Sequence, residues 1–220
     1  MRGIDSDGLV VVASTDGEAA PFRARGLPVV VSGVGRVNAA VATTLAVTSR
    51  STPPLVVAAG IAGALPVDGD FQGSPAIGSI VIADRCVYAE EGIITGDGFQ
   101  TISDMGFPVA TFAKGNSIPC DEAALDLIRS SMPAAVIGPI ATVATCSGTD
   151  ELASEIAGRT AAVAEAMEGA AVVHAARLLG ATAVEIRTIS NRTGDRDRQG
   201  WDLETALGAL ETVAEALVAR

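Results

Sequence analysis

Runs of apolar residues recur along the chain and stop at turn-rich or helical stretches. Runs that are apolar at nearly every position are typical of strands buried on both faces of a sheet. They cover residues 9–13, 28–32, 55–59, 134–145, 162–168 and 183–189, and an alternating run at 77–87 is also predicted to be a strand. Helical patterns lie between several of them, most clearly at 117–132 and 169–179, and another begins at Asp202. The alternation predicts an α/β fold with a central, mostly parallel, mixed sheet and helices on both faces.

Length and composition fit one such domain. The chain has 220 residues, of which 49% are hydrophobic and 19% are charged, and no linker, repeat or low-complexity run divides it. We therefore expect a single domain over residues 1–220. No apolar stretch reaches the roughly 18 to 20 residues of a membrane-spanning helix. Residues 1–8 show no signal-peptide pattern, so a cytoplasmic protein without a membrane partner is expected.

A carboxylate stands where the strand at 162–168 passes into the helix at 169–179. The strand ends in Met167 and Glu168, which places Glu168 at the carboxyl edge of the sheet, where ligands of open α/β sheets bind. An ionised Glu accepts hydrogen bonds at both oxygens and so matches two neighbouring hydroxyls, such as those of a ribose. Met167 would offer the sugar a soft apolar surface. On these residues alone, an acid placed for the helix dipole is an equally good interpretation.

Other strand ends deliver polar groups to the same edge. Glu18 follows the first strand in a turn-rich loop, and Ser190 and Asn191 follow the last strand. Gly60 and Gly63 flank a predicted turn after residue 59, where backbone N–H groups can approach a ligand closely. For Glu18 taken alone, an exposed loop acid or a helix cap is the simpler interpretation.

The stretch GVGRVNAA at 33–40 is close to a dinucleotide-binding fingerprint. Gly33 and Gly35 are in place, but Asn38 stands where the third glycine belongs. Residues 19–67 contain no Asp or Glu that could bind the cofactor's ribose. The glycines therefore indicate a tight strand-to-helix turn, and we expect no cofactor.

Charge and rare residues exclude other classes of protein. The net charge of −11, with a single Lys, argues against binding to a nucleic-acid backbone. Cys86, Cys120 and Cys146 lie far apart, so we expect small core residues and neither a disulfide framework nor a metal site. The single histidine, His174, lies inside an apolar helix, which favours a structural role over a catalytic one.

Several stretches together resemble the purine nucleoside phosphorylase and nucleosidase superfamily. They are MEGAA after a strand and the strand AVEIRTISN. Within the superfamily, GVGRVNAA, IGSIVIADRCVYAEEGIITGDGF, and ISN followed by RDRQGW are most similar to the futalosine hydrolases. The resemblance runs from about residue 10 to the end of the chain. It implies a nucleoside phosphorylase-type fold and a homo-oligomer.

The resemblance also implies an activity, hydrolysis of the N-glycosidic bond of futalosine in menaquinone biosynthesis with release of hypoxanthine. Glu18 would activate water, and Glu168 would hold the ribose diol. Asn191 would receive the departing 6-oxopurine, at a position where relatives that release adenine have Asp. The residues expected to contact substrate are Gly60, Gly63, Met167, Glu168, Ser190 and Trp201. No arginine clamp for phosphate is evident near the first and third strand ends, which favours water as the nucleophile.

Three alternatives stay open. They are a methylthioadenosine or adenosylhomocysteine nucleosidase, a phosphate-dependent purine nucleoside phosphorylase, and a non-catalytic module that binds purine nucleosides. Asn191 in place of Asp speaks against the first.

Futalosine carries an aromatic carboxylate, so we expect Trp201 near its 5′ end and one of Arg192, Arg196 or Arg198 near the carboxylate. The polar excursion at 88–99 is expected to shape a substrate rim or a subunit contact.

Overall fold

The computed structural model describes residues 8–219. The expectation about a signal peptide therefore concerns residues that lie almost wholly outside the described part. The strands are β1 (Leu9–Ala13), β2 (Val29–Val31), β3 (Leu55–Ala64), β4 (Ile80–Tyr88), β5 (Gly92–Thr95), β6 (Gly98–Thr101), β7 (Ser117–Pro119), β8 (Val136–Thr142), β9 (Ala164–Ala166) and β10 (Thr182–Arg192). The helices are α1 (Asp16–Ala24), α2 (Arg36–Thr48), α3 (Glu122–Ser131), α4 (Asp150–Thr160), α5 (Gly169–Leu178), the short 3₁₀ turn η2 (Arg196–Arg198) and α6 (Leu203–Val218).

The main sheet has eight strands in the order β10-β4-β8-β9-β3-β1-β2, with β7 beside β4. Strand β10 pairs with β3 as well as with β4, so five strands close into a ring from which β1 and β2 extend. Five of the pairings are parallel, β1 with β2 and β3, β3 with β10, and β8 with β4 and β9. Three are antiparallel, β10 with β4, β3 with β9 and β4 with β7. The prediction of a mostly parallel, mixed sheet is confirmed.

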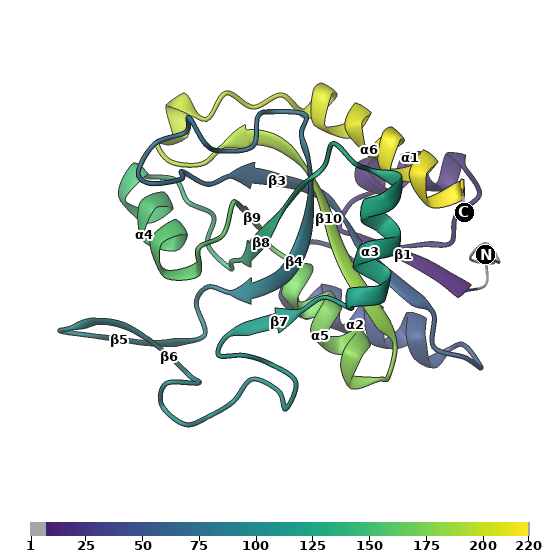
Figure 1. Ribbon diagram of the computed structural model, residues 1–220, viewed down its shortest axis with the longest axis horizontal. Helices are drawn as coiled ribbons and strands as arrows, with labels where there is room; N and C mark the ends of the chain where they lie inside the picture. The colour runs from purple at the N-terminus through teal and green to yellow at the C-terminus, as the bar shows by residue number, and fades with distance from the viewer. Residues whose placement is uncertain (1–7, 220) are drawn as a thin grey trace.

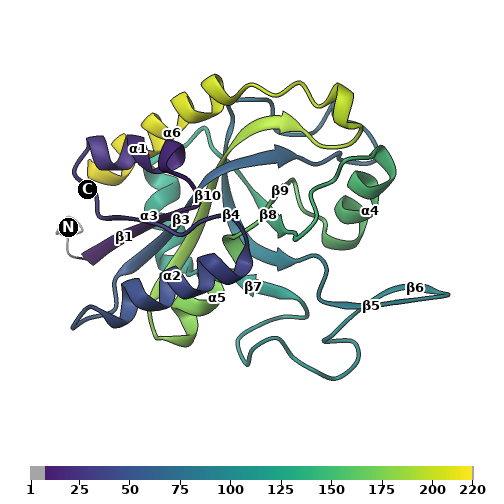
Figure 2. The same ribbon diagram turned by 180° about the vertical axis from the view of Figure 1, so that it is seen from behind.

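Helices cover the sheet on two sides. α1 packs against α6 on one side, and α2 packs against α5 on the other (Figures 1 and 2). The strands between them are buried throughout β1 and in most of β3 and β10. This burial explains the nearly unbroken apolar runs of β1 and β3, whereas β10 also carries buried charged residues. Among the described helices, none is long and apolar enough to cross a membrane.

Two local predictions are wrong. The predicted turn between Gly60 and Gly63 does not exist, because β3 continues to Ala64. β10 pairs alongside this segment from Arg187↔Gly60 onward, and those ladder hydrogen bonds hold the glycines extended. The predicted helix at 117–132 begins only at Glu122, because Ser117–Pro119 forms β7 against β4.

The excursion at 88–99 leads into the hairpin of β5 and β6, which projects away from the body of the molecule (Figure 1). Its expected part in a substrate rim or a subunit contact stays a prediction. His174 lies half-buried in α5, with Nδ1 3.2 Å from the Tyr88 hydroxyl and its ring edge-on to Phe112. These contacts fit the structural role expected for this histidine.

Candidate active site

A cavity of about 590 Å³ lies at the ends of β3, β9 and β10, next to the start of α1. Of the residues predicted from sequence, those that line it are Glu18, Gly63, Met167, Glu168, Ser190, Asn191, Arg196 and Trp201. Segments that are far apart in the chain thus meet at one place. Within residues 8–219, no group of three or more His, Cys, Asp and Glu side chains is placed to hold a metal ion.

Glu18 is fixed by the start of α1. It forms a capping box with Thr15, whose side chain accepts from the Glu18 N–H while the Glu18 carboxylate accepts from the Thr15 N–H at 3.0 Å. The same oxygen, Oε2, also accepts from the hydroxyls of Thr15 and Ser14, and Oε1 accepts from the Ile61 N–H at 2.9 Å. Glu18 is therefore both the helix cap of the simpler interpretation and a buried carboxylate that borders the cavity.

Gly60 lies one residue before the cavity-lining Ile61. It matters because, without a side chain, it leaves space above the backbone of β3. A Cβ atom at this position would stand 2.3 Å from Glu18 Oε1 and 2.7 Å from Arg187 Nη1. Both are far below ordinary contact distance. The glycine lets a carboxylate and a guanidinium approach over the backbone of β3.

Glu168 is the N-cap residue of α5, yet its side chain does not cap that helix. Oε1 accepts from the Gly35 N–H at 2.9 Å, and Oε2 accepts from Arg187 Nη2 at 3.2 Å. Gly35 has a φ of 96°, which turns its N–H toward the carboxylate at the start of α2. The glycine turn that resembled a dinucleotide fingerprint therefore holds a carboxylate of the cavity.

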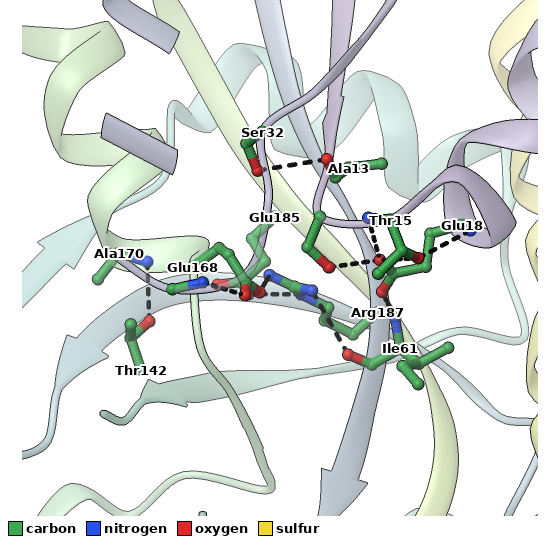
Figure 3. Close-up of polar contacts among 12 residues, drawn as sticks. Ala13, Thr15, Glu18, Ser32, Ile61, Thr142, Glu168, Ala170, Glu185 and Arg187 are labelled. Atoms are coloured by element: carbon green, nitrogen blue, oxygen red, sulfur yellow. Dashed lines mark hydrogen bonds and ion pairs between the residues drawn. The ribbon is translucent and has the colours of Figure 1, made fainter. Parts of the chain in front are cut away.

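Arg187 on β10 connects the acidic groups. Its side chain pairs with Glu168, and its Nε lies 2.8 Å from Glu185 Oε1. Figure 3 shows the guanidinium between Glu168 and Glu18. Burial works to lower the pKa of Arg187, but the three surrounding carboxylates together raise it above the ordinary arginine value. The residue is 2% exposed, so a permanent positive charge lies beneath the candidate site.

Ser190 and Asn191 end the buried part of β10, where the pairing with β3 is irregular. The Ser190 hydroxyl donates toward Asn191 Oδ1 at 2.8 Å, and Asn191 Nδ2 donates to the Arg192 carbonyl at 2.7 Å. These contacts orient the amide. One N–H and one acceptor lone pair of Asn191 remain for a ligand.

Glu165 and the loop after β8 form another wall. The buried Glu165 accepts from the Ser147 N–H at 2.8 Å and from the Ser147 hydroxyl at 2.6 Å. Burial raises the pKa of the Glu165 carboxyl, and the two Ser147 donors oppose that shift. Cys86 and Cys120 are buried as expected, whereas Cys146 is exposed and lines the cavity, so the prediction that it is a core residue is wrong.

The remaining wall carries the aromatic and cationic groups. Trp201 is 48% exposed, and the Arg196 guanidinium carbon lies 5.3 Å from its ring centre. Both residues line the cavity. Arg192 and Arg198 line a different cavity, where Arg192 lies over Phe71 and Arg198 pairs with Asp150.

Sequence reasoning missed Arg187, Glu185, Glu165 and Gln199 as residues of this region. A usable signal was present for the first two, because the buried run AVEIRTIS contains a Glu and an Arg two positions apart. Residues two apart in a strand share a face, and buried charges need partners.

Comparisons with known proteins bear on the family and the fold. A family model of the phosphorylase superfamily matches residues 22–220. Futalosine hydrolase of Acidothermus cellulolyticus is 41% identical over 164 residues, which are 74% of this chain and 64% of that protein. Futalosine hydrolase of Streptomyces coelicolor is 36% identical over 159 residues, 71% of this chain and 61% of that protein. The chain thus spans slightly less than two thirds of the length of these two relatives.

A third relative is matched over more of its length. Futalosine hydrolase of Thermus thermophilus is 32% identical over 192 residues, 86% of this chain and 79% of that protein. Among solved structures, the 5′-methylthioadenosine/S-adenosylhomocysteine nucleosidase of Neisseria meningitidis is similar with a TM-score of 0.75 at 22% identity, over 96% of this chain and 99% of that one. Futalosine hydrolase of Helicobacter pylori is similar with a TM-score of 0.75 at 17% identity, over 95% and 94%. At these identities the structures establish the nucleoside phosphorylase-type fold, and together with the family model and the Thermus relative they show that the chain belongs to the phosphorylase superfamily.

Proposed function

We propose that the protein hydrolyses the N-glycosidic bond of futalosine, in menaquinone biosynthesis, and releases hypoxanthine and dehypoxanthine futalosine. The observation that carries the proposal is the meeting of Glu18, Glu168 and Asn191 at one cavity in a chain similar to three futalosine hydrolases. Carboxylates suit a sugar and a water molecule, and an amide suits a purine edge.

In the proposed reaction, water attacks the anomeric carbon while the bond from that carbon to the purine nitrogen breaks. Glu18 takes a proton from the water as general base. Its position supports this role, because the N–H groups of Thr15 and Ile61 hold its carboxylate at the cavity wall. Glu168 accepts hydrogen bonds from the ribose hydroxyls. The Arg187 guanidinium pairs with Glu168 and places a positive charge beside the carboxylates at the cavity wall.

Asn191 recognises the leaving base through hydrogen bonds. The electron pair of the broken bond passes to the purine, and N7 takes a proton from solvent, so that neutral hypoxanthine leaves. The Asn191 amide can accept from this N7–H and donate to O6 of the 6-oxopurine. Ser190 supports this orientation, because its hydroxyl donates toward Asn191 Oδ1. Gly63 pairs with Asn191 in the neighbouring strand and lines the cavity, which leaves room for a planar ring. Met167, half-buried at the cavity wall, packs on the sugar.

The 5′ end of the nucleoside lies toward Trp201 and Arg196. Of the three arginines that the sequence left open, Arg196 is the one at this cavity, so it is our choice for the aromatic carboxylate. Leu203 and Leu207 from α6 add apolar surface beside Trp201. An aromatic ring with a cation next to it suits a substituent that is itself a benzoate.

A second candidate is a methylthioadenosine or adenosylhomocysteine nucleosidase. A relative with that name from a Marinomonas strain is 28% identical over 192 residues, 87% of this chain and 79% of that protein. Asn191 favours futalosine, because the 6-amino group of an adenine-type base would face the side-chain NH₂ of Asn191, and two donors cannot form a hydrogen bond.

The test is to incubate the purified protein with futalosine, inosine and methylthioadenosine, each with and without phosphate, and to quantify the released base. Futalosine cleavage without phosphate is the expected result. Preference for methylthioadenosine would identify the second candidate, and dependence on phosphate would identify a phosphorylase. Binding without release of base from any substrate would indicate a non-catalytic module.

We also infer that the protein is a homo-oligomer that associates through α2. Val37, Val41 and Leu45 form an apolar stripe along this helix and are 78%, 55% and 65% exposed. Helix α2 itself carries no acidic residue in a chain of net charge −11, so its apolar stripe brings no carboxylate of its own to a second copy. A monomer in sedimentation velocity at micromolar concentration would contradict the inference. The cytoplasmic location stays a prediction.

A further inference from the structure

The side-chain amide of Gln199, directly after η2, makes four hydrogen bonds. Nε2 donates to the carbonyls of Ser147 and Gly194, both at 3.0 Å. Oε1 accepts from Arg196 Nη1 at 2.9 Å and from Trp201 Nε1 at 2.7 Å. Both protons and both lone pairs of the amide are used. If the amide were flipped, its NH₂ group would face the two donors and its oxygen would face the two carbonyls. The hydrogen bonds therefore determine the orientation of the amide.

The two donors to Oε1 are the groups assigned above to the 5′ end of the substrate. An exposed arginine has many rotamers, and ordering it on binding costs free energy. Arg196 is exposed, but its contact with Gln199 and its position over Trp201 already restrict it. Its other N–H groups are left to form a paired contact with a planar carboxylate.

The two acceptors of Nε2 belong to two different loops, and one of them, Ser147, lines the cavity. Ser147 is held by Gln199 at its carbonyl and by Glu165 at its N–H and hydroxyl. Gly194 lies in the loop after β10. Gln199 itself is 5% exposed and lines the cavity. A single buried amide thus joins the loop after β8 to the groups at the 5′ end.

We propose that Gln199 is a positioning residue that makes the site selective for nucleosides with a planar anionic group at the 5′ end, because it holds Arg196 and Trp201 in place. This proposal rests on the proposed function. Gln199 does not reach the reacting atoms in this scheme. Its effect is on the binding of the 5′ group and not on bond cleavage.

The test compares futalosine with its methyl ester, which has the same shape without the negative charge, in wild type and in Gln199→Met. Methionine offers no acceptor to Arg196 and Trp201, so the Arg196 guanidinium is no longer held in place. We expect kcat/KM for futalosine to fall roughly 10- to 100-fold, mostly through a higher KM. The ester should change less than about 3-fold. Gln72→Met, at an exposed glutamine between β3 and β4, is the matched control and should leave both values unchanged.

A second variant covers the case in which Gln199→Met does not fold. Gln199→Glu keeps the shape and places a carboxylate against Arg196, which should neutralise the cation and again impair futalosine selectively. Adding Arg196→Ala to either variant should cause little further loss, whereas Arg196→Ala in wild type should cause the full loss. Equal losses for acid and ester, or additive losses in the double variant, would overturn the positioning role. No futalosine cleavage by the wild type would instead overturn the proposed function.

Discussion

Replacing Glu168 by Gln tests the ribose clamp. In the structure, one oxygen accepts from the Gly35 N–H and the other accepts from Arg187. Each oxygen keeps a lone pair for one ribose hydroxyl. In the variant an NH₂ group takes the place of one oxygen, so a donor must face either the Gly35 N–H or the guanidinium.

The expected loss can be derived from these contacts. A hydrogen bond to a charged group contributes about 1.5 to 3 kcal/mol, so losing one to the substrate lowers kcat/KM roughly 10- to 150-fold. The mismatch with Gly35 or Arg187 lowers the free energy of unfolding by about 1 to 3 kcal/mol as well. Arg187 keeps its pairing with Glu185, so the protein is expected to fold.

The assay measures kcat/KM for futalosine and for 2′-deoxyfutalosine in wild type and in Glu168→Gln. If Glu168 binds the 2′-hydroxyl, the deoxy substrate is poor in wild type and loses much less than futalosine in the variant. Glu155→Gln, at an exposed Glu paired with Arg159 on α4, is the control for loss of charge. Equal losses for both substrates, or a wild type that cleaves them equally well, would refute the clamp.

Three further outcomes are expected. Glu18→Gln should retain nucleoside binding in calorimetry but lower kcat roughly 10²- to 10⁴-fold, the usual effect of a general base, and a near-normal kcat would remove it from the mechanism. Asn191→Asp should shift the kcat/KM ratio toward the 6-amino counterpart of futalosine by roughly 5- to 150-fold, and an unchanged ratio would mean that other groups read the base. Gly169→Ala should lower the unfolding free energy by about 1 to 3 kcal/mol in denaturant titration, because its Cβ would lie 1.9 Å from the Glu185 carboxylate. Gly158→Ala on α4, where a Cβ would meet nothing within 4 Å, should not destabilise.

The sequence alone determined the type of fold and where its strands run. A strand buried on both faces is usually apolar at nearly every position, and this pattern is visible in β1, β3 and β8 without knowledge of their neighbours. The position of a residue at a strand end is equally local. Glu168 and Asn191 could therefore be assigned to one edge of the sheet before the strand order was known.

The order and extent of strand pairing came from the tertiary structure. Gly60 and Gly63 are typical of a turn, but pairing with β10, and for Gly63 also with β9, keeps them in a strand. Local propensity is weaker than a ladder of hydrogen bonds to a strand more than a hundred residues away. The same pairing brings Arg187 over Gly60, where it lies near Glu18 of α1 and pairs with Glu168 at the start of α5.

The choice among equivalent residues also depended on the tertiary structure. Arg192, Arg196 and Arg198 look alike in the sequence, because each is a charged residue in one polar loop. They differ in their partners, since Phe71 and Asp150 come from distant segments and hold Arg192 and Arg198 away from the cavity of Trp201. A side chain's partners are decided by which segments fold next to it, and burial periodicity along the chain carries no information about that.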